Sequence, residues 1–181
     1  SRRVLGVIRP TVECIGDLTQ NRHVGILATS GTIKSESYLL EIEKLFPDVT
    51  VTGEACPMWV PLVENNEYDS EGADYFVQKH IRQLLAKDPD IDTLILGCTH
   101  YPLLIEKIRQ FTPSHIRIVP QGEYVTQSLQ NYFRRHPEMD NRCTKEGTCR
   151  FLTTESETKF EESASIFLQQ EDIHVERIIL E

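Results

Sequence analysis

A cysteine and a histidine stand two residues apart directly after an apolar run. The run Thr93–Gly97 (TLILG) predicts a buried strand, and Cys98 and His100 follow it. A thiol between a strand and a helix N-terminus is well placed to ionise, because the helix amides stabilise a thiolate. His100 is close enough in sequence to exchange protons with that thiol or with a substrate. The pattern indicates a cysteine base or nucleophile, against the competing interpretation of a cysteine that only fills the core.

A second polar turn follows another predicted strand. The run His23–Thr29 (HVGILAT) is apolar, and Thr29–Thr32 (TSGT) turns the chain after it. In open parallel sheets, ligands bind outside the carboxyl ends of the strands. We therefore expect the Thr29–Thr32 turn and the Cys98–His100 turn to lie near one site.

The elements that must position these turns alternate between strand and helix patterns. Further strands are predicted at Val49–Gly53 and Ile116–Val119, and helices at Glu71–Lys87, at Glu123–Arg135 and around two apolar stripes (Leu39, Ile42 and Phe46; Leu104, Ile108 and Phe111). This alternation is typical of a parallel sheet covered by helices on both faces. The predicted fold class is α/β, with a flavodoxin-like or Rossmann-like parallel sheet.

The pattern changes after Pro120. The polar stretch His136–Thr148 predicts an exposed loop. A β-α-β tail is predicted beyond it, with strands at Arg150–Thr153 and Val175–Leu180 and a helix opened by a capping box of Thr154 and Glu157. A loop of that length suggests that the tail packs on something other than the first sheet.

Composition excludes several classes of function. The formal net charge is −9, which argues against binding to nucleic acid or to an anionic membrane surface. The apolar runs are far shorter than the roughly 20 residues of a membrane span. Five cysteines at irregular spacings, without an export signal, predict free thiols in a reducing cytoplasm. No set of cysteines and histidines has the spacing of a metal site, so no metal is expected.

Three segments together resemble one known family. Leu96–Leu104 (LGCTHYPLL) resembles the second cysteine motif of glutamate racemases, which belong to the aspartate/glutamate racemase family. The Thr29–Thr32 turn falls where that family has Gly-Thr-x-Gly-Thr, with Ala28 in place of the first glycine. Cys56–Glu64 (CPMWVPLVE) resembles the family's Cys-Pro-x-Phe-Val-Pro-Leu-Val-Glu segment. Aspartate racemases usually have Glu where His100 stands, which favours glutamate.

The resemblance implies a cofactor-independent interconversion of L- and D-glutamate that serves peptidoglycan synthesis. One thiolate removes the α-proton, and a thiol on the opposite face returns a proton. Cys98 would be one of the two thiols, with His100 assisting and Glu64 as a nearby acid. Thr99, Thr29 and Thr32 would bind the substrate.

The family's other half-site is not found in this sequence. Its Asp-Ser motif and its Ala-Cys-Asn-Thr motif are missing, and no Asn-Thr follows Cys14. We therefore expect residues 1–121 to correspond to the family's second lobe and residues 122–181 to pack with its first lobe. The chain alone is then expected to be inactive, with apolar surface that favours a homo-oligomer.

Two other interpretations remain open at this stage. In one, Cys98 is the nucleophile of a hydrolase or transferase, with His100 as its base. In the other, the chain is a non-catalytic module that binds an anion at the Thr29–Thr32 turn.

Overall fold

A computed structural model describes residues 5–180 of the chain. The chain forms two compact units, which divide between Arg135 and His136. This division falls after the last long helix of the first unit, whereas the boundary expected between lobes lies before that helix. The assignment of residues 1–121 and 122–181 to different lobes stays a prediction.

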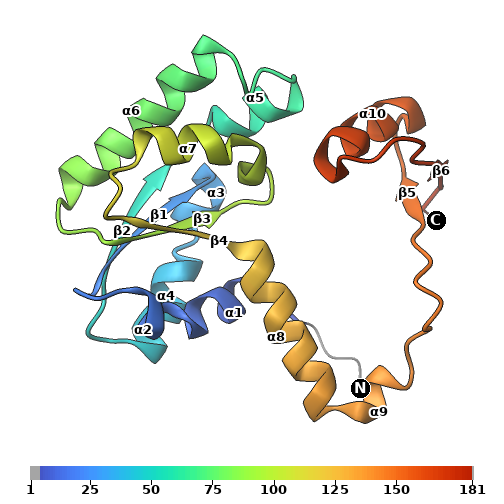
Figure 1. Cartoon of the computed structure of the whole chain (residues 1–181), viewed down its shortest axis with the longest axis horizontal. Helices are drawn as coiled ribbons and strands as arrows, with labels where there is room; N and C mark the ends of the chain where they lie inside the picture. The colour runs from blue at the N-terminus through green and yellow to red at the C-terminus, as the bar shows by residue number, and fades with distance from the viewer. Residues whose placement is uncertain (1–4, 181) are drawn as a thin grey trace. The chain divides into compact units, whose positions relative to one another are not determined.

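The first unit is built on a four-stranded parallel sheet (Figure 1). Its strand order is β2 (Thr50–Ala55), β1 (His23–Ala28), β3 (Thr93–Gly97) and β4 (Arg117–Pro120). Ala28 pairs in register with both Ala55 and Gly97, so three strands end level with one another. The predicted strands and the parallel α/β class are confirmed, and the order matches the first four positions of the flavodoxin-like arrangement.

Two short helices precede the first strand of this unit, and the other helices follow its strands along the chain. The helices are α1 (Ile8–Glu13), α2 (Ile15–Leu18), α3 (Ser30–Lys34), α4 (Ser37–Leu45), α5 (Trp59–Glu64), α6 (Glu71–Lys87), the 3₁₀ turn η1 (Tyr101–Leu104), α7 (Ile105–Phe111) and α8 (Gln121–Arg135). The bounds of α6 are those that the sequence predicts. Helix α4 ends before Phe46, because the following proline disfavours helical backbone at that residue.

Alternating side chains of the central strands belong to two separate hydrophobic cores, one on each face of the sheet. Leu27, Leu94 and Leu96 pack with the residues of α5, α6 and α7. Val24, Ile26 and Ile95 pack on the opposite face with residues of α1 and α4. Figure 1 shows these helix groups on the two sides of the sheet. Burying each such side chain contributes about 1.5–3 kcal/mol, so both faces hold the strand ends in place.

The second unit is the predicted β-α-β segment. It contains α9 (Pro137–Asp140), β5 (Phe151–Thr153), α10 (Glu157–Leu168) and β6 (Val175–Arg177), with β5 and β6 paired in parallel. The expected loop after Arg135 therefore includes one short helix, which has proline at its start.

The predicted capping box of α10 is wrong in its first residue. Ser156 is the N-cap, and its hydroxyl accepts a hydrogen bond from the backbone N–H of Lys159. Thr154 lies too early, because the chain is still turning there, with the Thr153 hydroxyl accepting from the N–H of Glu155.

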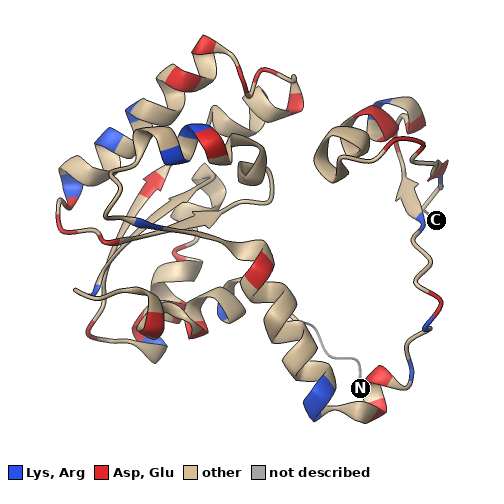
Figure 2. Ribbon diagram, in the orientation of Figure 1, with Lys and Arg blue, Asp and Glu red and all other residues tan. Residues whose placement is uncertain are grey.

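Charges of both signs are interspersed along the helices of the first unit (Figure 2). Lys107 of α7, for example, pairs with Asp74 of α6 at 2.6 Å. Within residues 5–180, no helix has the length and apolar character needed to cross a membrane.

Candidate active site

The candidate site lies where the sheet changes winding direction. The chain leaves β1 through α3 and α4, which pack on one face, and it leaves β3 through η1 and α7, which pack on the other. The two crossovers diverge at the carboxyl ends of neighbouring strands, which is the usual ligand position in such sheets. Thr29 and Cys98 each come one residue after the paired positions Ala28 and Gly97. The structure thus brings the two predicted turns to one edge.

Cys98, His100 and Glu64 form a continuous polar relay. The sulfur of Cys98 lies 3.9 Å from Nδ1 of His100, and Nε2 of His100 lies 2.5 Å from Oε1 of Glu64. Glu64 is the last residue of α5, so a segment more than 30 residues away in sequence supplies the carboxylate. A carboxylate on the far nitrogen orients an imidazole and stabilises its protonated form, as in catalytic triads. The relay can therefore move a proton to or from the sulfur.

Burial governs the ionisation of Cys98. Desolvation raises the pKa of the thiol, and the backbone N–H groups of His100, Tyr101 and Thr99 partly offset that rise. The amides act because they point toward the sulfur at the start of the turn. The net direction is upward, so the resting sulfur is mainly a thiol at neutral pH. An acceptor such as His100 is then needed to generate the thiolate.

The predicted substrate-binding threonines lie at this edge with different exposures. Thr29 is half-buried and caps α3, with its hydroxyl oxygen accepting from the N–H of Thr32 at 3.4 Å. The hydroxyls of Thr29 and Thr32 are 3.0 Å apart. Thr99 is exposed in the turn between Cys98 and His100. The two turns that follow β1 and β3 thus carry three threonines at the edge where Cys98 lies.

Two side chains at this edge were not singled out from the sequence. Tyr38 of α4 is buried, and its hydroxyl accepts a hydrogen bond from the side-chain amide of Gln121 at the start of α8. Burial, and then the charge of a Cys98 thiolate, raise the pKa of Tyr38. Sequence periodicity placed its neighbours Leu39 and Ile42 on the apolar stripe of α4, but a contact spanning 83 positions leaves no local pattern.

Gly97 is required by the packing of Tyr38. A Cβ added at Gly97 would lie 3.0 Å from Cβ of Ala28 and 3.1 Å from Cε2 of Tyr38. Ala28, which departs from the family's glycine at that position, fits because Gly97 opposite it has no side chain. The small pair lets the tyrosine ring lie against the end of the two strands.

The remaining cysteines differ from Cys98 in their surroundings. Cys56 is fully buried, and burial is the largest cause of its raised pKa. Cys14 directly follows α1, and its thiol donates to the carbonyl of Pro10 in that helix. Cys143 and Cys149 are exposed in the second unit. Within the described part of the chain, Cys98 is the cysteine that lies beside both a histidine and the strand ends.

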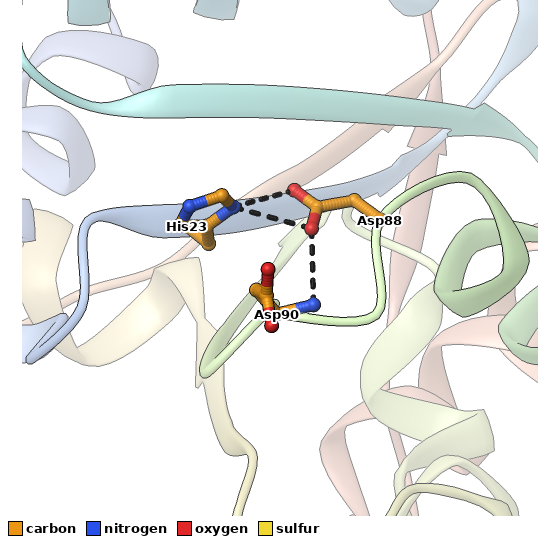
Figure 3. A group of neighbouring side chains, drawn as sticks. All are labelled: His23, Asp88 and Asp90. Atoms are coloured by element: carbon orange, nitrogen blue, oxygen red, sulfur yellow. Dashed lines mark hydrogen bonds and ion pairs between the residues drawn. The ribbon is translucent and has the colours of Figure 1, made fainter.

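A group of potential metal ligands occurs at the other end of β1 (Figure 3). Ligand atoms of His23, Asp88 and Asp90 lie within 4.8 Å of one another. Nδ1 of His23 lies 3.0 and 3.2 Å from the two oxygens of Asp88, which also accept from the Thr52 hydroxyl and the N–H of Asp90. Because the carboxylate is fully occupied by protein donors, we interpret the group as an ion pair that ties β1 to the loop after α6.

Comparison with known proteins gives a consistent family. The family described as Asp/Glu/Hydantoin racemase matches residues 3–146. A glutamate racemase of Streptococcus agalactiae is 38% identical over 180 residues, covering 98% of this chain and 66% of that protein. One from Enterococcus faecalis is 38% identical over 182 residues, covering 98% of this chain and 64% of the relative. The chain thus spans slightly less than two thirds of the length of these relatives.

Solved structures agree with the sequence relatives. The crystal structure of a glutamate racemase isoform from Bacillus anthracis aligns with a TM-score of 0.87 and 30% identity, over 99% of this chain and 66% of that one. A glutamate racemase from Francisella tularensis, solved in complex with D-glutamate, aligns with a TM-score of 0.81 and 27% identity, over 96% of this chain and 62% of that one.

Proposed function

The chain belongs to the Asp/Glu/hydantoin racemase family, and we propose that it is part of a glutamate racemase, interconverting L- and D-glutamate without a cofactor for peptidoglycan synthesis. The observation that carries the proposal is the relay from Cys98 through His100 to Glu64 at the switch point of the sheet. That relay joins a half-buried thiol to a base in the place where α/β proteins bind small ligands.

The proposed reaction begins with proton transfer from Cys98 to His100. Glu64 stabilises the imidazolium that results, and the thiolate then removes the α-proton of glutamate, becoming a thiol again. The electron pair of the broken C–H bond stays on the α-carbon, next to the α-carboxylate. Inversion follows when an acid on the opposite face delivers a proton to that carbon.

Substrate positioning is assigned to three threonines. The hydroxyls of Thr29, Thr32 and Thr99, with the amides of their turns, are donors for the two carboxylates and acceptors for the ammonium group of glutamate. Fixing the α-carbon near the sulfur supplies much of the rate, because orientation replaces a random encounter.

Cys98 is the thiol that we assign to one face of the substrate, and we assign no other cysteine of residues 5–180 to the opposite face. Cys56 also follows a strand at this edge, but it is fully buried and its thiol contacts the carbonyl of Glu54 at 3.7 Å. We therefore propose that the 181-residue chain holds one half of the active site. We retain the proposed lobe assignment, in which residues 122–181 pack with a further lobe.

The experiment is α-proton exchange of glutamate in deuterated water, followed by NMR. The account predicts slow exchange of one glutamate enantiomer with retained configuration, little exchange of aspartate, and no net racemisation. Racemisation by a monodisperse monomer would contradict the half-site. Absence of exchange, combined with a covalent acyl adduct on Cys98 from an activated ester, would instead support the hydrolase or transferase interpretation.

A further inference from the structure

Two buried aromatic side chains join the two elements that carry Glu64 and His100. Trp59 is the first residue of α5, and Tyr101 is the first residue of η1. Both side chains are 0% exposed. Their ring centroids lie 4.8 Å apart with an interplanar angle of 62°, which is an attractive edge-on geometry. This contact holds the start of α5 against the start of η1.

Each partner of the relay lies on one of these elements. Glu64 is the last residue of α5, and His100 directly precedes Tyr101. Five residues of an α-helix turn through about 140°, so the buried ring of Trp59 and the half-exposed side chain of Glu64 lie on different faces of α5. The aromatic pair in the core and the hydrogen bond of Glu64 with His100 nearer to solvent therefore join the same two elements.

Neither element is long enough to fix its own position. Helix α5 has six residues and η1 has four, and such short elements depend on packing for their stability. The support comes from α6, which has 17 residues. The indole N–H of Trp59 donates to the carbonyl of Phe76 on α6 at 3.3 Å, and the indole ring lies edge-on to the ring of His80, also on α6, with 6.3 Å between the centroids. Trp59 thus contacts both α6 and η1.

The hydrogen bond of Glu64 with His100 is sensitive to the position of α5. Nε2 of His100 lies 2.5 Å from Oε1 of Glu64. Hydrogen bonds between nitrogen and oxygen rarely exceed about 3.2 Å, so moving α5 away from η1 by about 1 Å would break this one. A change in the packing of Trp59 can therefore reach the relay without altering any residue of the relay.

We propose that Trp59 is a positioning residue, whose ring holds α5 against η1 so that the carboxylate of Glu64 meets the imidazole of His100. Trp59 acts only through Glu64. The inference rests on the proposed function, because the pair that Trp59 positions is the pair that assists Cys98.

The test is a double-mutant cycle on the rate of Cys98 alkylation by iodoacetamide at neutral pH, because that rate follows the fraction of thiolate. Mass spectrometry of the peptide that contains Cys98 separates it from the other four cysteines. Trp59→Leu and Glu64→Gln should each slow alkylation about five- to tenfold. The double variant should be no slower than Glu64→Gln, because the carboxylate through which Trp59 acts is already gone.

The outcomes separate the positioning role from the proposed function, since alkylation needs no glutamate. A native rate in folded Trp59→Leu, or a further slowing of the same size when Trp59→Leu is added to Glu64→Gln, would overturn the positioning role alone. A native rate in Glu64→Gln would overturn the relay itself and the positioning role with it.

Three further variants control for the loss of core volume. Leu84→Ala removes a fully buried side chain of α6 from the same core, near Gly25 in the first half of β1. It should lower the melting temperature and leave alkylation unchanged, and slowing equal to that in Trp59→Leu would indicate a merely structural effect. Trp59→Phe keeps a ring against Tyr101 and should alkylate at nearly the native rate, and a rate as slow as that of Trp59→Leu would overturn the role of the ring contact. Should Trp59→Leu not fold, Trp59→Met replaces it in the cycle, because its flexible side chain fills irregular core space.

Discussion

At the scale of single residues, three influences act on the ionisation of the Cys98 thiol: burial, the backbone amides and the pair of His100 with Glu64. Burial disfavours the thiolate of Cys98, and backbone amides favour it. In the proposed mechanism, His100 takes the proton, and Glu64 compensates the charge that His100 gains. Glu64 acts on the sulfur only through His100, and its side chain is 46% exposed. Its role is therefore the easiest to isolate by substitution.

Replacing Glu64 with Gln should slow α-proton exchange by about 10–100-fold, because a neutral amide stabilises the imidazolium less than a carboxylate does. NMR exchange rates at fixed pH provide the measurement. Glu67→Gln is the matched control, since Glu67 is an exposed acid three residues further along the chain. Equal rates for both variants would remove Glu64 from the mechanism.

At the scale of elements, the site depends on how β1 and β3 end. The ends can sit level because Gly97 leaves room for Ala28 and for the ring of Tyr38. Tyr38 is tied in turn to Gln121, so α4 and α8 are linked across the end of the sheet. These contacts set the position of Cys98, which is the next residue in the chain.

Gly97→Ala should lower the free energy of unfolding by about 1–3 kcal/mol through overpacking, and it should also slow exchange by displacing Cys98. Urea unfolding measures the first effect. Gly122→Ala is the comparison, because a Cβ there meets nothing within 4 Å and lies at the start of α8. Comparable stability of the two variants would contradict the packing account.

Local patterns were sufficient to predict most elements but not the contacts between them. The β3 strand and α6 were predicted with their observed bounds, because apolar periodicity and flanking prolines are local signals. The Ser156 cap was missed in favour of Thr154, since several hydroxyl residues precede the same helix. The pairing of His100 with Glu64 and that of Tyr38 with Gln121 bridge 36 and 83 positions, and periodicity contains no such information. Cys98 and His100 were singled out by their place after the predicted strand Thr93–Gly97, and Glu64 was found through the family motif.

At the scale of the whole molecule, the two ends of the parallel sheet carry different chemistry. The carboxyl end holds the candidate active site, and the amino end holds the ion pair of His23 with Asp88 (Figure 3). The hydrogen bond to Asp88 is the largest cause of a raised pKa for His23. Burial opposes ionisation of Asp88, but the donors around it outweigh burial and lower its pKa.

The pH dependence of stability follows from the raised pKa of His23 and the lowered pKa of Asp88. His23 contributes stability that is fully present below its ordinary pKa of 6.5 and lost as pH rises through its higher folded value. Asp88 contributes stability that is present above 3.8 and lost as pH falls through its lower folded value. Asp88→Asn should therefore destabilise the chain more at about pH 5.5 than at about pH 8.5.

Urea unfolding of the native chain and Asp88→Asn at both pH values is the measurement. Asp48→Asn is the control, because its pairing with Arg22 at 3.5 Å is exposed and should contribute little at either pH. A larger effect of Asp88→Asn at the higher pH would contradict the assigned directions.

The central claim is that Cys98 is the base that removes the α-proton of glutamate. The most direct measurement compares α-deuterium incorporation into glutamate by the native chain, by Cys98→Ala and by Cys143→Ala, whose thiol is exposed in the second unit. The account predicts that incorporation falls to the uncatalysed rate in Cys98→Ala and is unchanged in Cys143→Ala, with both variants folded. Undiminished incorporation in Cys98→Ala would contradict it.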